Sequence, residues 1–197
     1  MNWHRLLERP SFYNFSQKIL SIIAFGNHGI ADFLKDYFST GQSVLDLGCG
    51  TGRYADIFGD CYTGVDNNPS YIEAAGKNHL GSFLVADAAK LDFLKQRFDN
   101  VLSINTFHHL SDEQVSLAVG QMKKLAIKQI IVVDPVYPSK FNFLGYFLFK
   151  IDRGKYRRSY SQHKGLLESL GFKAIRPRLK NSFPYRVCVF RHEIGKI

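Results

Sequence analysis

The sequence predicts a single α/β domain whose sheet is mostly parallel and carries helices on both faces. The 197 residues are 45% apolar and 22% charged, a composition that suits one domain with a buried core. Short apolar runs alternate along the chain with helix-like patterns, and parallel strands need such crossover helices. The last two runs are too close together for a crossover helix, so we expect them to pair as an antiparallel hairpin.

The predicted elements follow one another in a regular order. Residues 1–40 have the pattern of helices and form an expected N-terminal cap. Ser111 precedes a helical pattern that continues to Leu125, and Gln114 completes a capped start. Seven apolar or β-branched runs are the expected strands: residues 43–47, 61–65, 82–86, 100–104, 129–134, 172–177 and 185–190.

Hydropathy and cysteine content bear on where the chain resides. The longest apolar runs, residues 19–25 and 141–149, are shorter than the ~20 residues that span a bilayer. The first ten residues mix both charge signs and lack the apolar stretch of a secretory signal. The three cysteines are odd in number and widely spaced, so we expect buried thiols and no disulfide framework or metal site. We therefore expect a cytoplasmic chain.

The charge is distributed unevenly. Residues 1–99 hold 9 basic and 11 acidic side chains, whereas residues 100–197 hold 17 and 6, so the halves carry −2 and +11. A positive field of this size attracts phosphates, carboxylates, nucleic acid or anionic lipid. It indicates the kind of partner and carries no information about the fold.

A glycine-rich loop follows the first expected strand. It runs from Asp46 through Gly48, Gly50 and Gly52, with a glycine at every second position. Alternating glycines allow the backbone to approach a ligand closely. The dinucleotide-binding fingerprint would need another glycine where Arg53 stands, and no Gly-Lys-Ser/Thr of a P-loop is present. By itself such a loop more often marks a tight strand-to-helix turn than a ligand site.

Polar residues follow the next three expected strands, where ligands bind in open α/β sheets. A carboxylate beside the glycine loop can accept both hydroxyls of a ribose, and a side chain one strand further can reach an adenine amino group. The residues at these strand ends are Asp66 and Asn67, then Asp87 and Ala88, then Asn105, His108 and His109.

These motifs together resemble the class I S-adenosylmethionine-dependent methyltransferases, especially the small-molecule group that includes the ubiquinone and menaquinone biosynthesis methyltransferases. The likeness rests on VLDLGCGTG, TGVDNNPSYIEAA, FLVADAAKLDF, FDNVLSINTFHHL and IIVVDPV, in this order within residues 43–136. It implies a three-layer, Rossmann-like sheet of seven strands with an antiparallel last strand. The expected core for the cofactor is residues 43–134, followed by a substrate-covering lid at 135–160 and a final helix and hairpin at 161–197.

The resemblance also implies roles for individual residues. The three loop glycines would line the methionine part of S-adenosylmethionine, Asp66 would bind ribose, Asp87 and Ala88 would meet adenine, and Asn105 would face the methionine end. Plainer roles stay open: Asp46 either contacts the ligand or braces the loop, Asp87 could cap a helix, and the histidine pair either moves a proton or packs. Asp134-Pro-Val-Tyr137 imitates an amino-group methyltransferase motif but follows the fifth strand, so we reject that reading.

The methyl acceptor is expected to bind under the lid. Residues 141–151 are aromatic and aliphatic, and the following cationic cluster of Arg153, Lys155, Arg157 and Arg158 suits an acceptor with an apolar body and an anionic group. The same stretch is compatible with an ordinary buried helix, or with a helix that lies on an anionic membrane. We expect a small-molecule or lipid-like acceptor; the alternatives are an RNA methyltransferase and a non-catalytic S-adenosylmethionine-binding protein.

Overall fold

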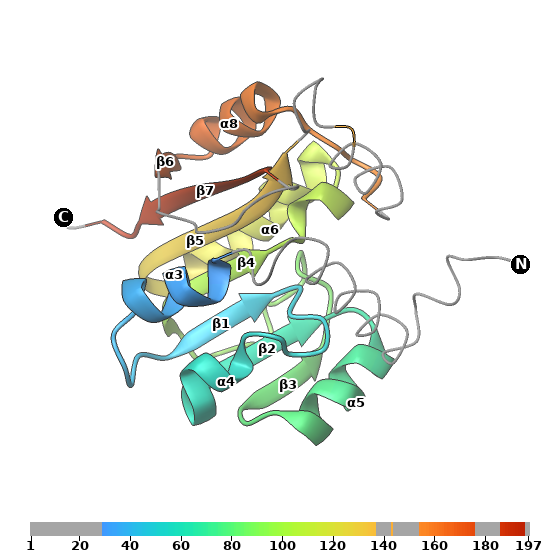
Figure 1. The fold of residues 1–197 in the computed structure, drawn as a ribbon, viewed down its shortest axis with the longest axis vertical. Coiled ribbons are helices and arrows are strands. Elements are labelled where there is room, and N and C mark those ends of the chain that lie inside the picture. The colour runs from blue at the N-terminus through green and yellow to red at the C-terminus, as the bar shows by residue number, and fades with distance from the viewer. Residues whose placement is uncertain (1–28, 137–142, 144–153, 176–185, 196–197) are drawn as a thin grey trace, which may run out of the picture.

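The computed structural model describes residues 29–136, 143, 154–175 and 186–195. Its strands form one seven-stranded sheet in the order β3-β2-β1-β4-β5-β7-β6 (Figure 1). Strands β1 to β5 pair in parallel, and β7 is antiparallel to both β5 and β6. The predicted sheet and its antiparallel hairpin are confirmed. The strands are β1 (Val44–Leu47), β2 (Tyr62–Asp66), β3 (Ser82–Val85), β4 (Phe98–Ile104), β5 (Ala126–Val136), β6 (Lys173–Ile175) and β7 (Arg186–Glu193).

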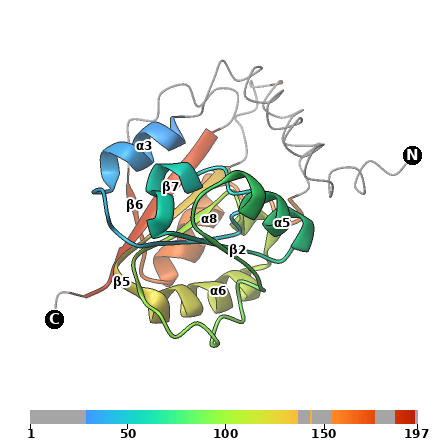
Figure 2. The same ribbon diagram turned by 90° about the horizontal axis from the view of Figure 1, so that it is seen from below.

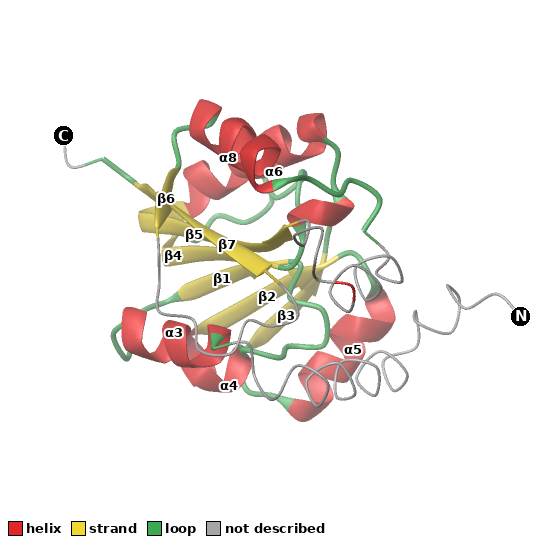
Figure 3. Cartoon of the chain, turned by 45° about the horizontal axis from the view of Figure 1, so that its top comes forward, coloured by secondary structure: helices red, strands yellow, loops and turns green. Residues whose placement is uncertain are grey.

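Helices cover both faces of the sheet. One face carries α3 (Ile30–Tyr37), α4 (Ala55–Phe58) and α5 (Pro69–Asn78), and the other carries α6 (Asp112–Leu125) and α8 (Tyr160–Ser169) (Figures 2 and 3). Two 3₁₀ turns, η1 (Gly59–Cys61) and η2 (Phe107–His109), complete the described elements. The expected three-layer arrangement is therefore present.

Each face of the sheet has its own apolar core. Along β5, Ile130 and Val132 belong to the core under α6 and α8, whereas Ile131 and Val133 belong to the core under α3 and α4. All four side chains are at most 1% exposed, because successive residues of a strand point to opposite faces. Burying one such side chain contributes ~1.5–3 kcal/mol. A strand buried on both faces explains the continuous apolar run in the sequence.

The start of α6 follows the predicted cap. Ser111 Oγ accepts a hydrogen bond from Gln114 N, and the Gln114 side chain accepts one from Ser111 N. This capping box fixes the helix directly after the histidine turn η2. The fifth strand begins earlier than predicted, at Ala126, because α6 ends at Leu125 and Ala126 already pairs with Phe98 of β4.

Several expectations fall partly outside the described residues. These are most of the N-terminal cap, the apolar stretch at 141–151 except Phe143, Arg153 and the turn of the final hairpin. Within the described part of the chain no helix is long and apolar enough to cross a membrane. All three cysteines are free; Cys49 and Cys188 are buried as expected, but Cys61 is only half-buried because it lies in η1, outside the two cores.

Candidate functional site

The glycine loop after β1 is held by the end of β2. The amides of Gly48 and Cys49 both donate to the carbonyl of Val65, at 2.7 and 3.1 Å. Asp66 Oδ2 accepts from Gly50 N at 3.0 Å, and its Oδ1 accepts from Asn68 N at 2.9 Å. The carboxylate predicted to bind ribose thus fixes the loop and the start of α5 in this structure, and its contact with ribose stays a prediction.

The end of β4 packs directly on the same loop. A Cβ atom at Gly48 would overlap the side chain of Thr106, and the φ of +78° at Gly48 is in the left-handed region. The Thr106 hydroxyl donates to the carbonyl of Leu47 at 3.2 Å. Only glycine fits this position without strain, so the loop has no side chain where the segment after β1 packs against the segment after β4.

Asp46 lies under the loop as a buried carboxylate that is only half satisfied. It is 1% exposed, and the hydroxyl of Tyr62 donates to its Oδ2 at 2.6 Å. Its Oδ1 makes no hydrogen bond to any described residue. Burial raises the pKa of Asp46 to about 6, although the Tyr62 hydrogen bond opposes this rise and the nearby Asp66 carboxylate adds to it. Such an oxygen suits a cationic hydrogen-bond donor, as the ammonium of a bound amino acid would supply.

The predicted adenine residues line a small hollow. Its volume is about 150 Å³, and its walls include Asp87, Ala88, Leu110 and Leu117. Asp87 Oδ1 accepts from Ala89 N at 2.9 Å, so the suggested capping role takes the form of a turn rather than a helix start. The hollow brings the end of β3 together with the segment after η2 and with α6.

Two further predicted residues are exposed at the same edge. Asn67 follows β2 directly, and Asn105 follows β4. Asn105 has a φ of 54°, in the left-handed region that asparagine tolerates better than most residues. The backbone amide of Asn105 donates to the carbonyl of Val133 at 2.8 Å, so β5 holds this turn in place.

The two predicted histidines have different environments. His108 is 4% exposed, and its Nδ1 lies 3.0 Å from Asp134 Oδ1. His109 is exposed, and its ring centroid lies 4.1 Å from that of His108. A carboxylate at Nδ1 favours the tautomer in which Nδ1 carries the proton and Nε2 carries the lone pair. Of the pair, His108 therefore has the arrangement of a general base.

Sequence reasoning missed two residues of this buried polar group. Asp134, near the end of β5, is fully buried, and His163 of α8 places its Nδ1 4.0 Å from Asp134 Oδ2. Burial lowers the pKa of His163, and the Asp134 carboxylate partly opposes this effect. A search for acidic residues at every strand end would have found Asp134, whereas a single histidine on a helix gives no comparable signal.

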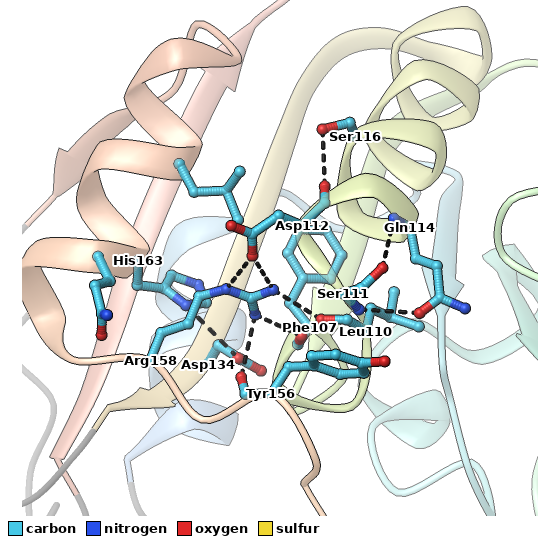
Figure 4. A network of polar contacts seen from close by, with 12 residues as sticks. Phe107, Leu110, Ser111, Asp112, Gln114, Ser116, Asp134, Tyr156, Arg158 and His163 are labelled. Carbon is cyan, nitrogen blue, oxygen red and sulfur yellow. Dashed lines mark hydrogen bonds and ion pairs between the residues drawn. The ribbon is translucent and has the colours of Figure 1, made fainter.

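The described cationic residues of the expected lid are not equivalent. Arg158 is buried, and its guanidinium donates to Asp112 Oδ1 and to the carbonyls of Phe107, Leu110 and Tyr156 (Figure 4). Arg157 Nε donates to the carbonyl of Gly154 at 3.0 Å, and Lys155 is exposed. The expected open cationic cluster is therefore wrong for Arg158, because this side chain is already committed to protein acceptors.

The fold and the loop are similar to those of a known class of proteins. A seven-stranded sheet of this order, with a bare glycine loop after its first strand and polar residues at the neighbouring strand ends, is the Rossmann-like architecture of class I methyltransferases. Residues 44–128 match the family of methyltransferase domains. The chain therefore contains a region similar to methyltransferase domains, within a sheet of the fold that such domains share.

Curated relatives share the core of the chain. The mouse "Probable tRNA methyltransferase 9B" is 35% identical over 98 residues, which are 49% of this chain and 22% of that protein. The Saccharomyces cerevisiae "tRNA (carboxymethyluridine(34)-5-O)-methyltransferase" is 29% identical over 157 residues, 77% of this chain and 50% of the yeast protein. The chain thus spans half or less of the length of these relatives.

A solved structure shares the fold. The magnesium protoporphyrin IX methyltransferase of Synechocystis, with bound S-adenosylhomocysteine (SAH), aligns with a TM-score of 0.61 and 17% identity. The alignment covers 98% of this chain and 93% of that one. The match extends the common fold beyond the region shared with the family.

Proposed function

We propose that the chain transfers a methyl group from S-adenosylmethionine to a small-molecule or lipid-like acceptor whose reacting atom carries a proton. The observation that carries this proposal is the buried His108–Asp134 pair, which lies two residues along the chain from Thr106, the residue that packs on Gly48 of the glycine loop. A base at this place is useful only if the acceptor must lose a proton when it attacks.

The cofactor residues are assigned from their positions. Gly48, Gly50 and Gly52 would contact the methionine part, with the ammonium group against Asp46 Oδ1, the buried oxygen without a described partner. Asp66 and Asn67 would receive the ribose, Asp87 and Ala88 the adenine, and Asn105 would face the methionine end. The hollow between Ala88 and Leu110 supports the adenine assignment because it offers an apolar wall beside a carboxylate.

The cofactor supplies a methyl group on a positively charged sulfur, which keeps the electron pair of the broken S–C bond. The work left to the protein is to align the acceptor, to exclude water and to take up the proton. His108 Nε2 accepts the proton of the acceptor as the new bond to carbon forms. The Asp134 carboxylate then stabilises the imidazolium, because it already accepts a hydrogen bond from Nδ1.

The anionic part of the acceptor has fewer candidate partners than the sequence suggested. Lys155 is exposed and Arg157 is half-buried, so both are retained as candidates. Arg153 lies outside the described residues. Arg158 is omitted because its donors already serve the protein.

RNA is the second candidate acceptor. Two observations favour it: curated relatives are named as tRNA methyltransferases, and residues 100–197 carry a charge of +11. A basic surface of this kind binds phosphates in a salt-dependent manner. A carboxymethyl acceptor, as in the name of the yeast relative, is already a carboxylate at neutral pH and has no proton to give to His108.

A label-transfer experiment separates these acceptors. The protein is incubated with S-adenosylmethionine that carries a tritiated methyl group and, separately, with a small-molecule extract, anionic lipid vesicles and total tRNA. We expect label in the small-molecule or lipid fraction, with transfer ~100-fold slower in His108→Ala and retained in His109→Ala. Label found only in tRNA would overturn this acceptor class. A folded wild-type protein that does not bind SAH in calorimetry would overturn the cofactor assignment.

A further inference from the structure

Residues 154–158, here called the strap, lie against the turn that carries His108. The strap follows the connection after β5 and leads directly into the capped start of α8 at Ser159. It contacts the histidine turn through the glycine backbone of Gly154, the backbone amide of Tyr156 and the guanidinium of Arg158. These contacts converge on one residue of the proposed mechanism.

Gly154 forms the closest contact. It is buried, and a Cβ atom at this position would overlap Cδ2 of His108 and lie 3.1 Å from the His108 carbonyl oxygen. The imidazole cannot easily move aside, because its Nδ1 is held by Asp134 and the ring is 4% exposed. The strap backbone therefore limits the position of the ring on this side.

The remaining contacts hold the backbone of the turn. Tyr156 N donates to the carbonyl of His108 at 3.0 Å. Arg158 Nη1 donates to the carbonyl of Phe107 at 2.9 Å, and its Nη2 donates to that of Leu110 at 2.7 Å. Three carbonyls of the histidine turn thus accept hydrogen bonds from the strap.

Asp112 fixes the guanidinium in this orientation. Its Oδ1 accepts from Arg158 Nε at 2.9 Å and from Nη2 at 2.6 Å (Figure 4). Arg158 is 6% exposed, whereas the Asp112 side chain is 73% exposed. A planar guanidinium with several fixed donors holds a turn more rigidly than a lysine ammonium could.

We propose that the strap positions His108 for proton transfer, with Gly154 and Arg158 as its positioning residues. This inference rests on the proposed function, in which His108 is the base. A strap that only supported the fold would need no close contact with the imidazole, whereas Gly154 makes such a contact. Arg158, which the sequence suggested as a partner of the acceptor, acts instead on the histidine turn.

The test observes His108 directly and needs no acceptor. The protein is labelled with ¹⁵N-histidine, saturated with SAH and studied by NMR, and the His108 and His109 signals are assigned with His108→Gln and His109→Gln. In the wild type we expect a protected Nδ1–H signal from His108. Gly154→Ala should remove this signal because the added methyl group displaces the ring. Gly165→Ala is the matched control, since a Cβ there meets nothing within 4 Å and the position lies in helix α8.

Two milder variants keep the test decisive if Gly154→Ala does not fold. Arg158→Lys and Asp112→Asn weaken the hold on the turn, and both should speed solvent exchange of the His108 Nδ1–H by about tenfold. SAH affinity, measured by calorimetry on the same samples, should stay within about twofold of the wild type.

The outcomes separate the inference from the proposed function. Folded variants of Gly154, Arg158 or Asp112 whose His108 signal matches the wild type in chemical shift and solvent exchange would overturn the inference. A joint loss of the signal and of SAH binding would also overturn it. Failure of the wild type to bind SAH would overturn the proposed function, and the His108 signals would still report whether the strap positions the ring.

Discussion

Asp46 is the residue at which the stability of the fold and the proposed binding of the cofactor are most clearly opposed. Burial raises its pKa from 3.8 to about 6, so the ionised carboxylate is costly in the folded chain. The difference between these values corresponds to ~3 kcal/mol. The cost is absent below pH 3.8, grows as the pH rises to about 6, and is complete above that value. Wild-type stability from this group therefore falls as the pH rises through this range.

Asp46→Asn removes the charge and keeps an oxygen that can accept from Tyr62. In the absence of cofactor we expect a gain of ~1–3 kcal/mol at pH 7.5 and almost none at pH 3.5. For a chain of 197 residues this is a Tm rise of roughly 2–12 °C. The same variant should bind SAH at least ~10-fold more weakly, because a neutral amide replaces the carboxylate beside the ammonium.

Urea unfolding at the two pH values and calorimetric titration with SAH measure these effects. Asp46→Glu is a useful control, since it keeps the charge and should show no gain at pH 7.5. A variant that is no more stable than the wild type at pH 7.5, or equally stabilised at both pH values, would refute the electrostatic reasoning. Wild-type SAH affinity in Asp46→Asn would instead assign Asp46 to bracing the loop.

Three further predictions concern the same edge of the sheet. Asp66→Ala should weaken SAH binding by ~10- to 100-fold in calorimetry, because it removes an acceptor from both the ligand and the loop; unchanged affinity would contradict the ribose assignment. His108→Ala should lower the rate of label transfer by ~100-fold and leave SAH affinity intact, whereas His109→Ala should lower that rate by less than about twofold. Equal effects of the two variants would assign the pair to packing. Gly48→Ala should lower the free energy of unfolding by ~1–3 kcal/mol in urea titration and should reduce SAH affinity. The alanine must displace Thr106 and adopt a left-handed φ. A variant that behaves like the wild type would be incompatible with the loop geometry.

Much of the fold and of the edge could be predicted because the relevant signals are local in the sequence. The run Ile130–Val133 is apolar because both faces of β5 are covered, and Ser111 and Gln114 form their capping box within four residues. The glycine loop and the polar residues after each strand follow the same rule, since parallel strands bring their carboxyl ends to one edge.

The rest depends on tertiary contacts that no local pattern encodes. Arg158 looks like any residue of a basic cluster, but three of its four acceptor residues, Phe107, Leu110 and Asp112, lie 46 to 51 residues away. The sequence presents Asp134 only as part of a motif whose position argues against a site, although its carboxylate contacts His108 in the fold. Charge and hydropathy report which residues are polar, and only packing shows which of them are already satisfied.

The choice between acceptors depends on proton demand more than on surface charge. A positive half of the chain attracts a phosphate, a carboxylate and a membrane alike, so the +11 charge does not discriminate among them. The proposed role of the His108–Asp134 pair does discriminate, because a general base is of use to a hydroxyl or amine acceptor and of no use to an acceptor that is already ionised. Turnover with an acceptor that must lose a proton should fall when His108 is replaced, whereas turnover with a carboxylate acceptor should not depend on His108. The rate of label transfer in the wild type, compared with that in His108→Ala, therefore identifies the acceptor class even before the acceptor itself is known.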